Sequence, residues 1–259
     1  MDKINITEYN RKAWDANVKK GNQWTIPVTD DEIEKAKKGE WQIVLTPIKP
    51  VPQQWFGNVA GKKILCLASG GGQQVPILAA AGAIVTSFDN SPAQLQQDEI
   101  TCQKHGLKIT TIQGDMNDLS ALAANEFDIA FNPCSTIFVE DVKNVYRQVY
   151  RVMKPQGCFM TGFTNPVLWQ MDEEEREKGK LELIYAQPYS DLKSLPANKL
   201  QKLYDENESI IFAHTLEDLL GGQLQAGMVI THLFEDTMGG KQKCDELMST
   251  FMATRAIKL

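Results

Sequence analysis

The chain has 259 residues, of which 42% are hydrophobic and 23% are charged, and its formal net charge is −6. This length and composition are typical of one large globular domain with insertions. The acidic balance, without a clustered basic face, excludes the electrostatic pattern of a DNA-binding protein and disfavours RNA less strongly. No run approaches the roughly 18 apolar residues that a membrane span needs, so we expect no membrane partner.

The cysteines and the start of the chain predict a cytoplasmic protein. The five cysteines are odd in number and form no Cys-x-x-Cys pair, which is typical of reduced structural thiols. The first residues lack the apolar core of a signal peptide. His105 and His232 have no partners at ligand spacing, so we predict no metal site.

The beginning of the chain predicts a helical arm outside the main sheet. Residues 5–17 carry aromatic and small side chains on one side at helical spacing. Thr29 begins a capping box that opens a second helix, and Gly39 closes that helix. Three prolines over residues 47–52 then favour an extended connector.

From Lys63 onward, apolar runs and helical stretches alternate. Such alternation predicts an α/β fold, with a doubly wound parallel sheet that carries helices on both faces. In a sheet of this kind the carboxyl ends of the strands meet at one edge, where ligands bind. The apolar runs are 63–67, 83–88, 108–112, 127–131 and 157–163, and the helical stretches lie near 73–82, 91–105, 118–124 and 140–153.

A second segment breaks this alternation and predicts an inserted cap. It contains a charged helical stretch over 172–178 and a polar helix near 196–207. Thr215 then caps a new helix, and two strand-like runs at 228–235 and 249–258 close the chain. The predicted division is an arm over 1–60, a core over 61–164 and 214–259, and a cap over 165–213.

The strongest functional signal is a glycine-rich loop between the first strand and helix of the core. The apolar run at 63–67 ends in Ala68-Ser69-Gly70-Gly71-Gly72, and the next run ends in Asp89. Glycines let the backbone turn tightly and approach a ligand without a Cβ in the way. An acid at the end of the following strand can accept hydrogen bonds from both ribose hydroxyls. The pattern predicts a nucleoside site.

Two rival readings of this loop fail on spacing. A dinucleotide fingerprint, Gly-x-Gly-x-x-Gly, would need a glycine where Val75 stands, and a P-loop would need Gly-Lys-Ser/Thr. A third interpretation is a glycine turn that binds no ligand. It would leave the matching positions of the two acids, Asp89 and Asp115, to chance.

The region 63–163 and the closing helix and strand pair resemble the class I S-adenosylmethionine-dependent methyltransferases. Gly70 and Gly72 match the middle and last glycines of the family's acid-x-Gly-x-Gly-x-Gly pattern. Two positions depart from it: Ala68 replaces the first glycine, which is compatible with the loop if its φ is negative, and Cys66 replaces the acid that commonly supports the loop. The resemblance implies a seven-stranded sheet with an antiparallel last strand, and S-adenosylmethionine as cofactor, with S-adenosylhomocysteine as product.

The resemblance also implies roles for individual residues. Asp89 would accept from the ribose hydroxyls and Asp115 from the adenine amino group, with Met116 packed on the ring. Trp14 lies in a segment, residues 9–15, that resembles the N-terminal helix that closes over the cofactor in many small-molecule methyltransferases. An equal alternative is that Trp14 only packs the arm onto the sheet. The implied cofactor-binding set is Trp14, Ala68, Ser69, Gly70, Gly71, Gly72, Gln73, Asp89, Asn90, Gln94, Asp115, Met116, Asn132 and Pro133.

Two further positions stay open. Some amino-group methyltransferases carry Asn-Pro-Pro and an aromatic residue where this chain has Asn132-Pro133-Cys134-Ser135. Without that aromatic platform we interpret the segment as a ligand-lining loop, with an amino-group site as the alternative. The candidate base is His214, although a lone histidine at a loop end is more often structural.

The predicted function is methyl transfer to a small-molecule acceptor. An in-line transfer depends on alignment and exclusion of water, and needs a base only if the acceptor must lose a proton first. Substrate choice should then reside in the arm and the cap. The alternatives are a non-catalytic or regulatory protein that binds S-adenosylmethionine or S-adenosylhomocysteine and, less favoured, an NAD(P)-dependent oxidoreductase. The expected state is a monomer or homodimer.

Overall fold

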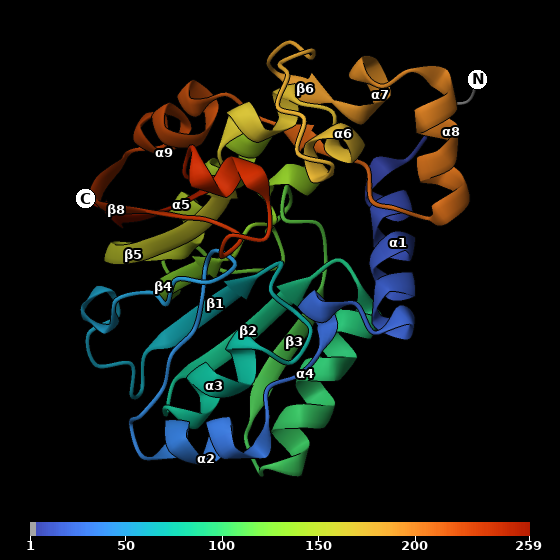
Figure 1. Cartoon of the computed structure of the whole chain (residues 1–259). Coiled ribbons are helices and arrows are strands. Elements are labelled where there is room, and N and C mark those ends of the chain that lie inside the picture. The colour runs from blue at the N-terminus through green and yellow to red at the C-terminus, as the bar shows by residue number, and fades with distance from the viewer. Residues whose placement is uncertain (1–3) are drawn as a thin grey trace.

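The computed structural model describes residues 4–259, so the first three residues of the predicted arm lie outside it. Its centre is a seven-stranded sheet in the order β3-β2-β1-β4-β5-β9-β8 (Figure 1). Neighbouring strands are parallel except β9, which is antiparallel to both of its neighbours. The predicted fold class is confirmed. The strands are β1 (Lys63–Leu67), β2 (Ile84–Asp89), β3 (Ile109–Gln113), β4 (Phe127–Asn132), β5 (Met153–Thr164), β8 (Met228–Asp236) and β9 (Phe251–Lys258).

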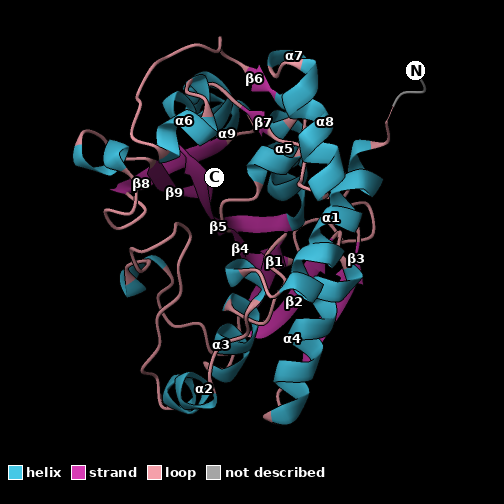
Figure 2. Ribbon diagram, turned by 45° about the vertical axis from the view of Figure 1, so that its right-hand side comes forward, coloured by secondary structure: helices cyan, strands magenta, loops and turns pink. Residues whose placement is uncertain are grey.

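Helices cover both faces of this sheet. On one face lie α3 (Gln74–Ala80) and α4 (Pro92–Lys104), and α1 (Ile6–Lys20) packs beside α4 (Figure 2). On the other face α5 (Val142–Val152) packs against α9 (Gly222–Gln225), which continues a π-helical turn over Glu217–Gly221.

Strand β1 shows why its sequence is apolar at every position after Lys63. Ile64 and Cys66 belong to the hydrophobic cluster that includes α3, whereas Leu65 and Leu67 belong to the cluster that includes α5. All four are fully buried. A central parallel strand buries both of its faces, so alternation between polar and apolar residues disappears.

Local sequence patterns predicted one helix correctly and another wrongly. Thr29 and Glu32 form the predicted capping box at the start of α2 (Asp30–Lys37), and Gly39 follows that helix with a φ of +87°. The helix predicted at 118–124 is wrong. The Asp118 carboxylate accepts from the Ser120 N–H at 2.9 Å, forming a local turn that competes with a helix.

The segment between β5 and the π-helical turn forms a separate packed unit. It has its own hydrophobic cluster, which includes Leu168, Trp169 and Tyr189. Figure 1 shows it at the top of the molecule, with α8 above α1. Its elements are η4 (Pro166–Gln170), α6 (Glu173–Glu177), β6 (Tyr189–Ser190), α7 (Asp191–Ser194), α8 (Ala197–Glu206) and β7 (Phe212–Ala213).

The arm contacts this unit directly. The Asn10 side chain of α1 donates to the Ile210 carbonyl at 3.0 Å and accepts from the Ile210 N–H at 2.8 Å. Tyr9 and Tyr204 pack edge to face, with ring centroids 5.6 Å apart. Two segments separated by almost the whole core therefore meet over the sheet edge.

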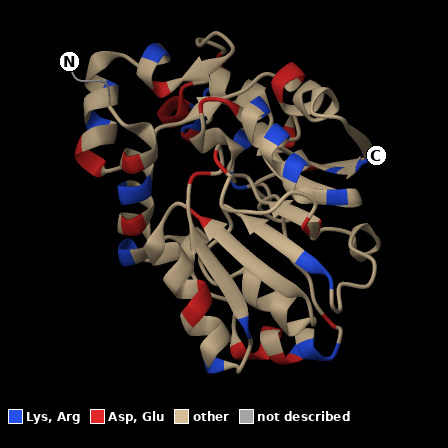
Figure 3. Ribbon diagram, turned by 180° about the vertical axis from the view of Figure 1, so that it is seen from behind, with Lys and Arg blue, Asp and Glu red and all other residues tan. Residues whose placement is uncertain are grey.

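Two features of the structure bear on the predicted absence of nucleic-acid and membrane partners: the distribution of charged residues and the length of the helices. In Figure 3 the positions of the basic and the acidic residues are interspersed along the ribbon. Among residues 4–259, no helix is long and apolar enough to cross a membrane.

Candidate active site at the carboxyl ends of the strands

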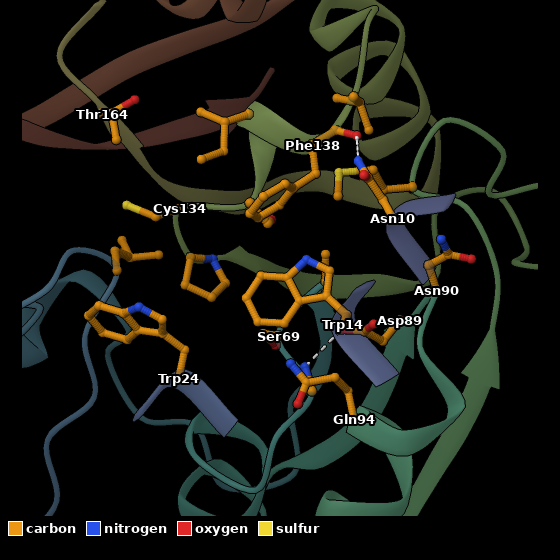
Figure 4. A pocket seen from close by; sticks show the side chains of 18 of the residues that line it. Asn10, Trp14, Trp24, Ser69, Asp89, Asn90, Gln94, Cys134, Phe138 and Thr164 are labelled. Atoms are coloured by element: carbon orange, nitrogen blue, oxygen red, sulfur yellow. Dashed lines mark hydrogen bonds between the residues drawn. The ribbon is translucent and has the colours of Figure 1, made fainter. Parts of the chain in front are cut away.

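A cavity of about 540 Å³ lies where β1, β2 and β4 end. The arm, the glycine loop and the segment after β5 contribute its walls. In Figure 4 Asp89 and Asn90 lie on one side of it, and Cys134 and Thr164 on the opposite side. The predicted residues that line it are Trp14, Ala68, Ser69, Gly70, Gln73, Asp89, Asn90, Gln94, Asp115, Met116 and Pro133.

Asp89 ends β2 and ties the glycine loop to α4. One carboxylate oxygen accepts from the Gly70 N–H at 3.1 Å, and the other accepts from the Ser91 N–H at 2.9 Å. Burial raises the pKa of Asp89 to about 6, and these two N–H donors act in the opposite direction. Each oxygen keeps a second acceptor site, which suits a pair of ribose hydroxyls.

Ala68 begins the loop in a left-handed conformation, with a φ of +46°. The condition named above for an alanine at this position, a negative φ, is therefore not met. The turn lets the Ala68 N–H donate to the Phe88 carbonyl at 2.7 Å, so the chain passes from β1 across the end of β2. A residue with a Cβ in this region is strained by roughly 1–2 kcal/mol, which is the physical reason for glycine at this position.

Gly70 is required by crowding. A Cβ at this position would lie 2.7 Å from the Gln94 Cβ and 3.1 Å from an Asp89 carboxylate oxygen. The loop backbone and the start of α4 are therefore in direct contact, which brings the Ser69 and Gln94 side chains to one part of the cavity wall (Figure 4).

Gly71 and Gly72 do not line the cavity; they face the arm. Their φ values are +117° and +78°. A Cβ at Gly72 would lie 2.8 Å from Pro27, and the Gly72 carbonyl accepts from the Val28 N–H at 2.9 Å. These glycines let the segment after α1 pack against the back of the loop.

The acid missing from β1 is supplied by α4. Asp98 is fully buried, and its carboxylate accepts from the Gly72 N–H and from the Ser87 hydroxyl, both at 2.7 Å. Burial raises the pKa of Asp98 to about 8. The Cys66 thiol is also fully buried, and burial raises its pKa. The sequence analysis missed Asp98, although an acid among the buried positions Leu95 and Cys102 of one helix was a usable signal.

Asp115 anchors the first turn of the arm. One of its carboxylate oxygens accepts from the Thr7 hydroxyl at 2.8 Å, and the Asn90 side chain donates to the Thr7 carbonyl at 2.7 Å. Further along α1, Trp14 packs edge to face on Phe138, with centroids 5.3 Å apart. The arm therefore crosses the cavity at the ends of β2 and β3.

Asn132 and His214 lie outside the cavity lining. The Asn132 amide donates to the Leu67 carbonyl at 2.8 Å and accepts from the Thr161 hydroxyl at 3.1 Å, so it braces the sheet. The His214 ring is buried, with Nε2 3.0 Å from the Thr136 carbonyl oxygen, and burial lowers its pKa. Both side chains therefore contact neighbouring protein groups and do not face the cavity.

The donor and acceptor set fits S-adenosylmethionine. Ser69 of the loop and Gln94 of α4 line the cavity, and their Oγ and Oε1 atoms are buried and have no hydrogen-bond partner among residues 4–259. Asp89 and Asp115 add acceptors, and Met116 adds an apolar surface. In the same part of the chain, no group of three His, Cys, Asp or Glu side chains is placed to hold a metal ion.

Comparison with known proteins decides the family. A family model described as "Methyltransferase domain" matches residues 65–161. The "Uncharacterized methyltransferase YbaJ" of Bacillus subtilis is 45% identical over 254 residues, which cover 98% of this chain and 99% of that protein. The chain belongs to the S-adenosylmethionine-dependent methyltransferases. The predicted family and its cofactor, S-adenosylmethionine, are confirmed.

Two other comparisons are more partial. The ubiquinone biosynthesis O-methyltransferase of Pseudomonas syringae pv. tomato is 31% identical over 127 residues, which cover 47% of this methyltransferase and 55% of that protein. The solved structure of an S-adenosylmethionine-dependent methyltransferase from Mesorhizobium loti has a TM-score of 0.60 at 20% identity, covering 80% of this chain and 95% of that one. The second comparison establishes the shared fold.

Beyond the predicted set, the methyltransferase cavity has walls that the sequence analysis did not assign. One group of these residues comes from the end of β5, the segment after it, the loop before β9 and the start of β9. These lining residues are Thr164, Leu168, Trp169, Glu173, Arg176, Met238, Gln242 and Phe251, which we call the acceptor compartment.

Proposed function

We propose that this methyltransferase transfers a methyl group to a small-molecule acceptor held in the acceptor compartment. The observation that carries the proposal is one cavity of about 540 Å³ that extends from Asp89 to Arg176. That volume is in the range of small-molecule sites, and the cofactor occupies part of it. The Pseudomonas syringae relative is an O-methyltransferase of ubiquinone biosynthesis by its name, which supports a small-molecule acceptor.

The chain's own residues would bind the cofactor and exclude water. Asp89 accepts hydrogen bonds from the ribose hydroxyls and Asp115 from the adenine amino group, while Met116 packs on the ring. Trp14 and Phe138 cover this part of the cavity. S-Adenosylmethionine supplies a methyl group on a sulfonium centre with a good leaving group. The protein's contribution is therefore alignment for an in-line transfer in a site without bulk water.

The division into arm, core and cap follows from this proposal. The arm over 1–60 and the cap over 165–213 both contribute cavity walls outside the sheet, so they would select the acceptor. The absence of an acid at Cys66 was one reason to consider a non-catalytic binding protein. Asp98 supports the glycine loop instead, which removes that reason. Cytoplasmic location, a monomeric or homodimeric state and the lack of a nucleic-acid partner stay predictions from composition.

A thermal-shift series with a transfer assay tests the proposal. A ligand at a hundredfold its Kd stabilises the folded state by about 2.7 kcal/mol. S-Adenosylhomocysteine should raise the melting temperature, NADH should not, and labelled methyl should reach a member of a small-molecule panel. Asp89→Ala should abolish the shift, whereas Asp205→Asn, at an exposed position of α8, should retain it. A shift with NADH alone, or an undiminished shift in Asp89→Ala, would contradict the assignment.

A further inference from the structure

Apart from Thr164 and Gln242, the acceptor compartment is lined by apolar side chains and one ion pair. Of the described residues that line the whole cavity, the charged ones are Asp89, Asp115, Glu140, Glu173 and Arg176. Asp89 and Asp115 lie at the end of the cavity proposed for the cofactor, which we call the cofactor end. Of these five charged residues, only Glu173 and Arg176 come from the acceptor compartment. Leu168 and Trp169 are buried beside them. We therefore infer the charge of the acceptor from the Glu173–Arg176 pair.

Arg176 is fixed in the wall and barely reaches the cavity. Its side chain is 2% exposed. One terminal nitrogen donates to the Leu168 carbonyl at 2.8 Å, and the guanidinium carbon lies 5.9 Å from the centre of the Trp169 ring. Its Nε–H has no partner among the described residues. A buried cation with few partners favours a nearby carboxylate, and Glu173 fills that place.

Glu173 is the member of the pair that a ligand can reach. Its side chain lines the cavity and is 61% exposed, and one carboxylate oxygen lies 3.5 Å from an Arg176 terminal nitrogen. This long contact is its only hydrogen bond within residues 4–259. Surrounding protein raises the pKa of Glu173 by desolvation, while Arg176 lowers it. The carboxylate thus has free acceptor sites that a ligand in the cavity can reach.

We propose that Glu173 binds a hydrogen-bond-donating group of the acceptor, a hydroxyl or an amine, on a molecule that is otherwise apolar and carries no anionic group. This inference rests on the proposed function. Arg176 acts as a positioning residue, because it holds the carboxylate from within the wall. An anionic acceptor is disfavoured because Glu173, not Arg176, presents the accessible charge. Trp169, Leu168 and Phe251 supply the surface for the apolar body.

Three one-ring probes separate these chemistries: benzyl alcohol, benzylamine and benzoate. Their binding is measured by calorimetry on the full chain saturated with S-adenosylhomocysteine. The alcohol and the amine should bind, and benzoate should bind about tenfold more weakly or not at all. A hydrogen bond to a charged group predicts that Glu173→Gln weakens the alcohol and the amine by about tenfold to a hundredfold.

Glu177→Gln is the matched control, since Glu177 lies on the same helix but does not line the cavity. It should bind all three probes as the unaltered protein does. Tighter binding of benzoate than of the alcohol, unchanged affinities in Glu173→Gln, or no binding by any probe would overturn the role of Glu173. Failure of S-adenosylhomocysteine itself to bind, measured first in each sample, would instead overturn the proposed function.

Discussion

Asp98 offers the sharpest test of how the glycine loop is supported. In Asp98→Asn the remaining oxygen can still accept from the Gly72 N–H, and the new amide can donate to the Ser87 oxygen. The shape and both hydrogen bonds are kept, while the buried ionisable group is removed. The variant therefore isolates the titration of one carboxyl group.

The sign and size of the effect follow from the pKa. Burial raises the pKa of Asp98 from 3.8 to about 8. Between these values the folded state holds a proton that the unfolded state has released, so the free energy of unfolding falls as pH rises. The slope is about 1.4 kcal/mol per pH unit for one group. From about pH 5 to about pH 7, Asp98→Asn should gain about 2–3 kcal/mol relative to the unaltered protein.

Urea unfolding at several pH values measures this difference. The stability contribution of protonated Asp98 is fully present below about pH 4 and is lost by the time the pH has risen past about 8. Asp205→Asn is the control, because Asp205 lies at an exposed position of α8 and is not among the charges that shift the pKa of Asp98, so the pH profile of this variant should parallel that of the unaltered protein. Parallel profiles for Asp98→Asn as well would refute the reasoning, since they would mean that Asp98 does not titrate in this range.

Three further variants test the loop and the arm. Gly70→Ala places a Cβ 2.7 Å from the Gln94 Cβ, so we expect a loss of about 1–3 kcal/mol in urea unfolding and weaker S-adenosylhomocysteine binding by calorimetry. Ala68→Gly relieves a φ of +46° and should stabilise by up to about 1 kcal/mol, and destabilisation would contradict the strain argument. Trp14→Ala removes the ring that packs on Phe138 and should weaken S-adenosylhomocysteine binding about tenfold, whereas Trp14→Phe should retain most affinity; equal affinities would mean that the ring only packs the arm.

Local chemistry explains what the sequence could predict. Short continuous apolar runs that alternate with helical stretches, such as 64–67, are typical of strands buried on both faces, so the sheet could be predicted from the pattern. The capping box at Thr29 is a contact between near neighbours, and its geometry is visible in the chain. The position of Asp89 was predictable for the same reason, because a strand end fixes it.

The failures are of two kinds. At 118–124 a side-chain turn at Asp118 outcompeted the weak helical pattern, and at Ala68 the backbone adopts a φ that only the closed loop requires. The others are non-local. Asp98 reaches Gly72 across 26 positions, and the Arg176–Glu173 pair becomes part of the cavity only when the whole segment after β5 folds over the strand ends.

The arm links the two ends of the cavity physically. Thr7 bonds to Asp115 at the cofactor end, while Asn10, one turn later on the same helix, bonds to Ile210 of the inserted segment. Because α1 is rigid over this distance, a shift of its first turn must move both contacts together. We therefore expect the cofactor that we propose at Asp115 to restrain the inserted segment, which also carries Glu173.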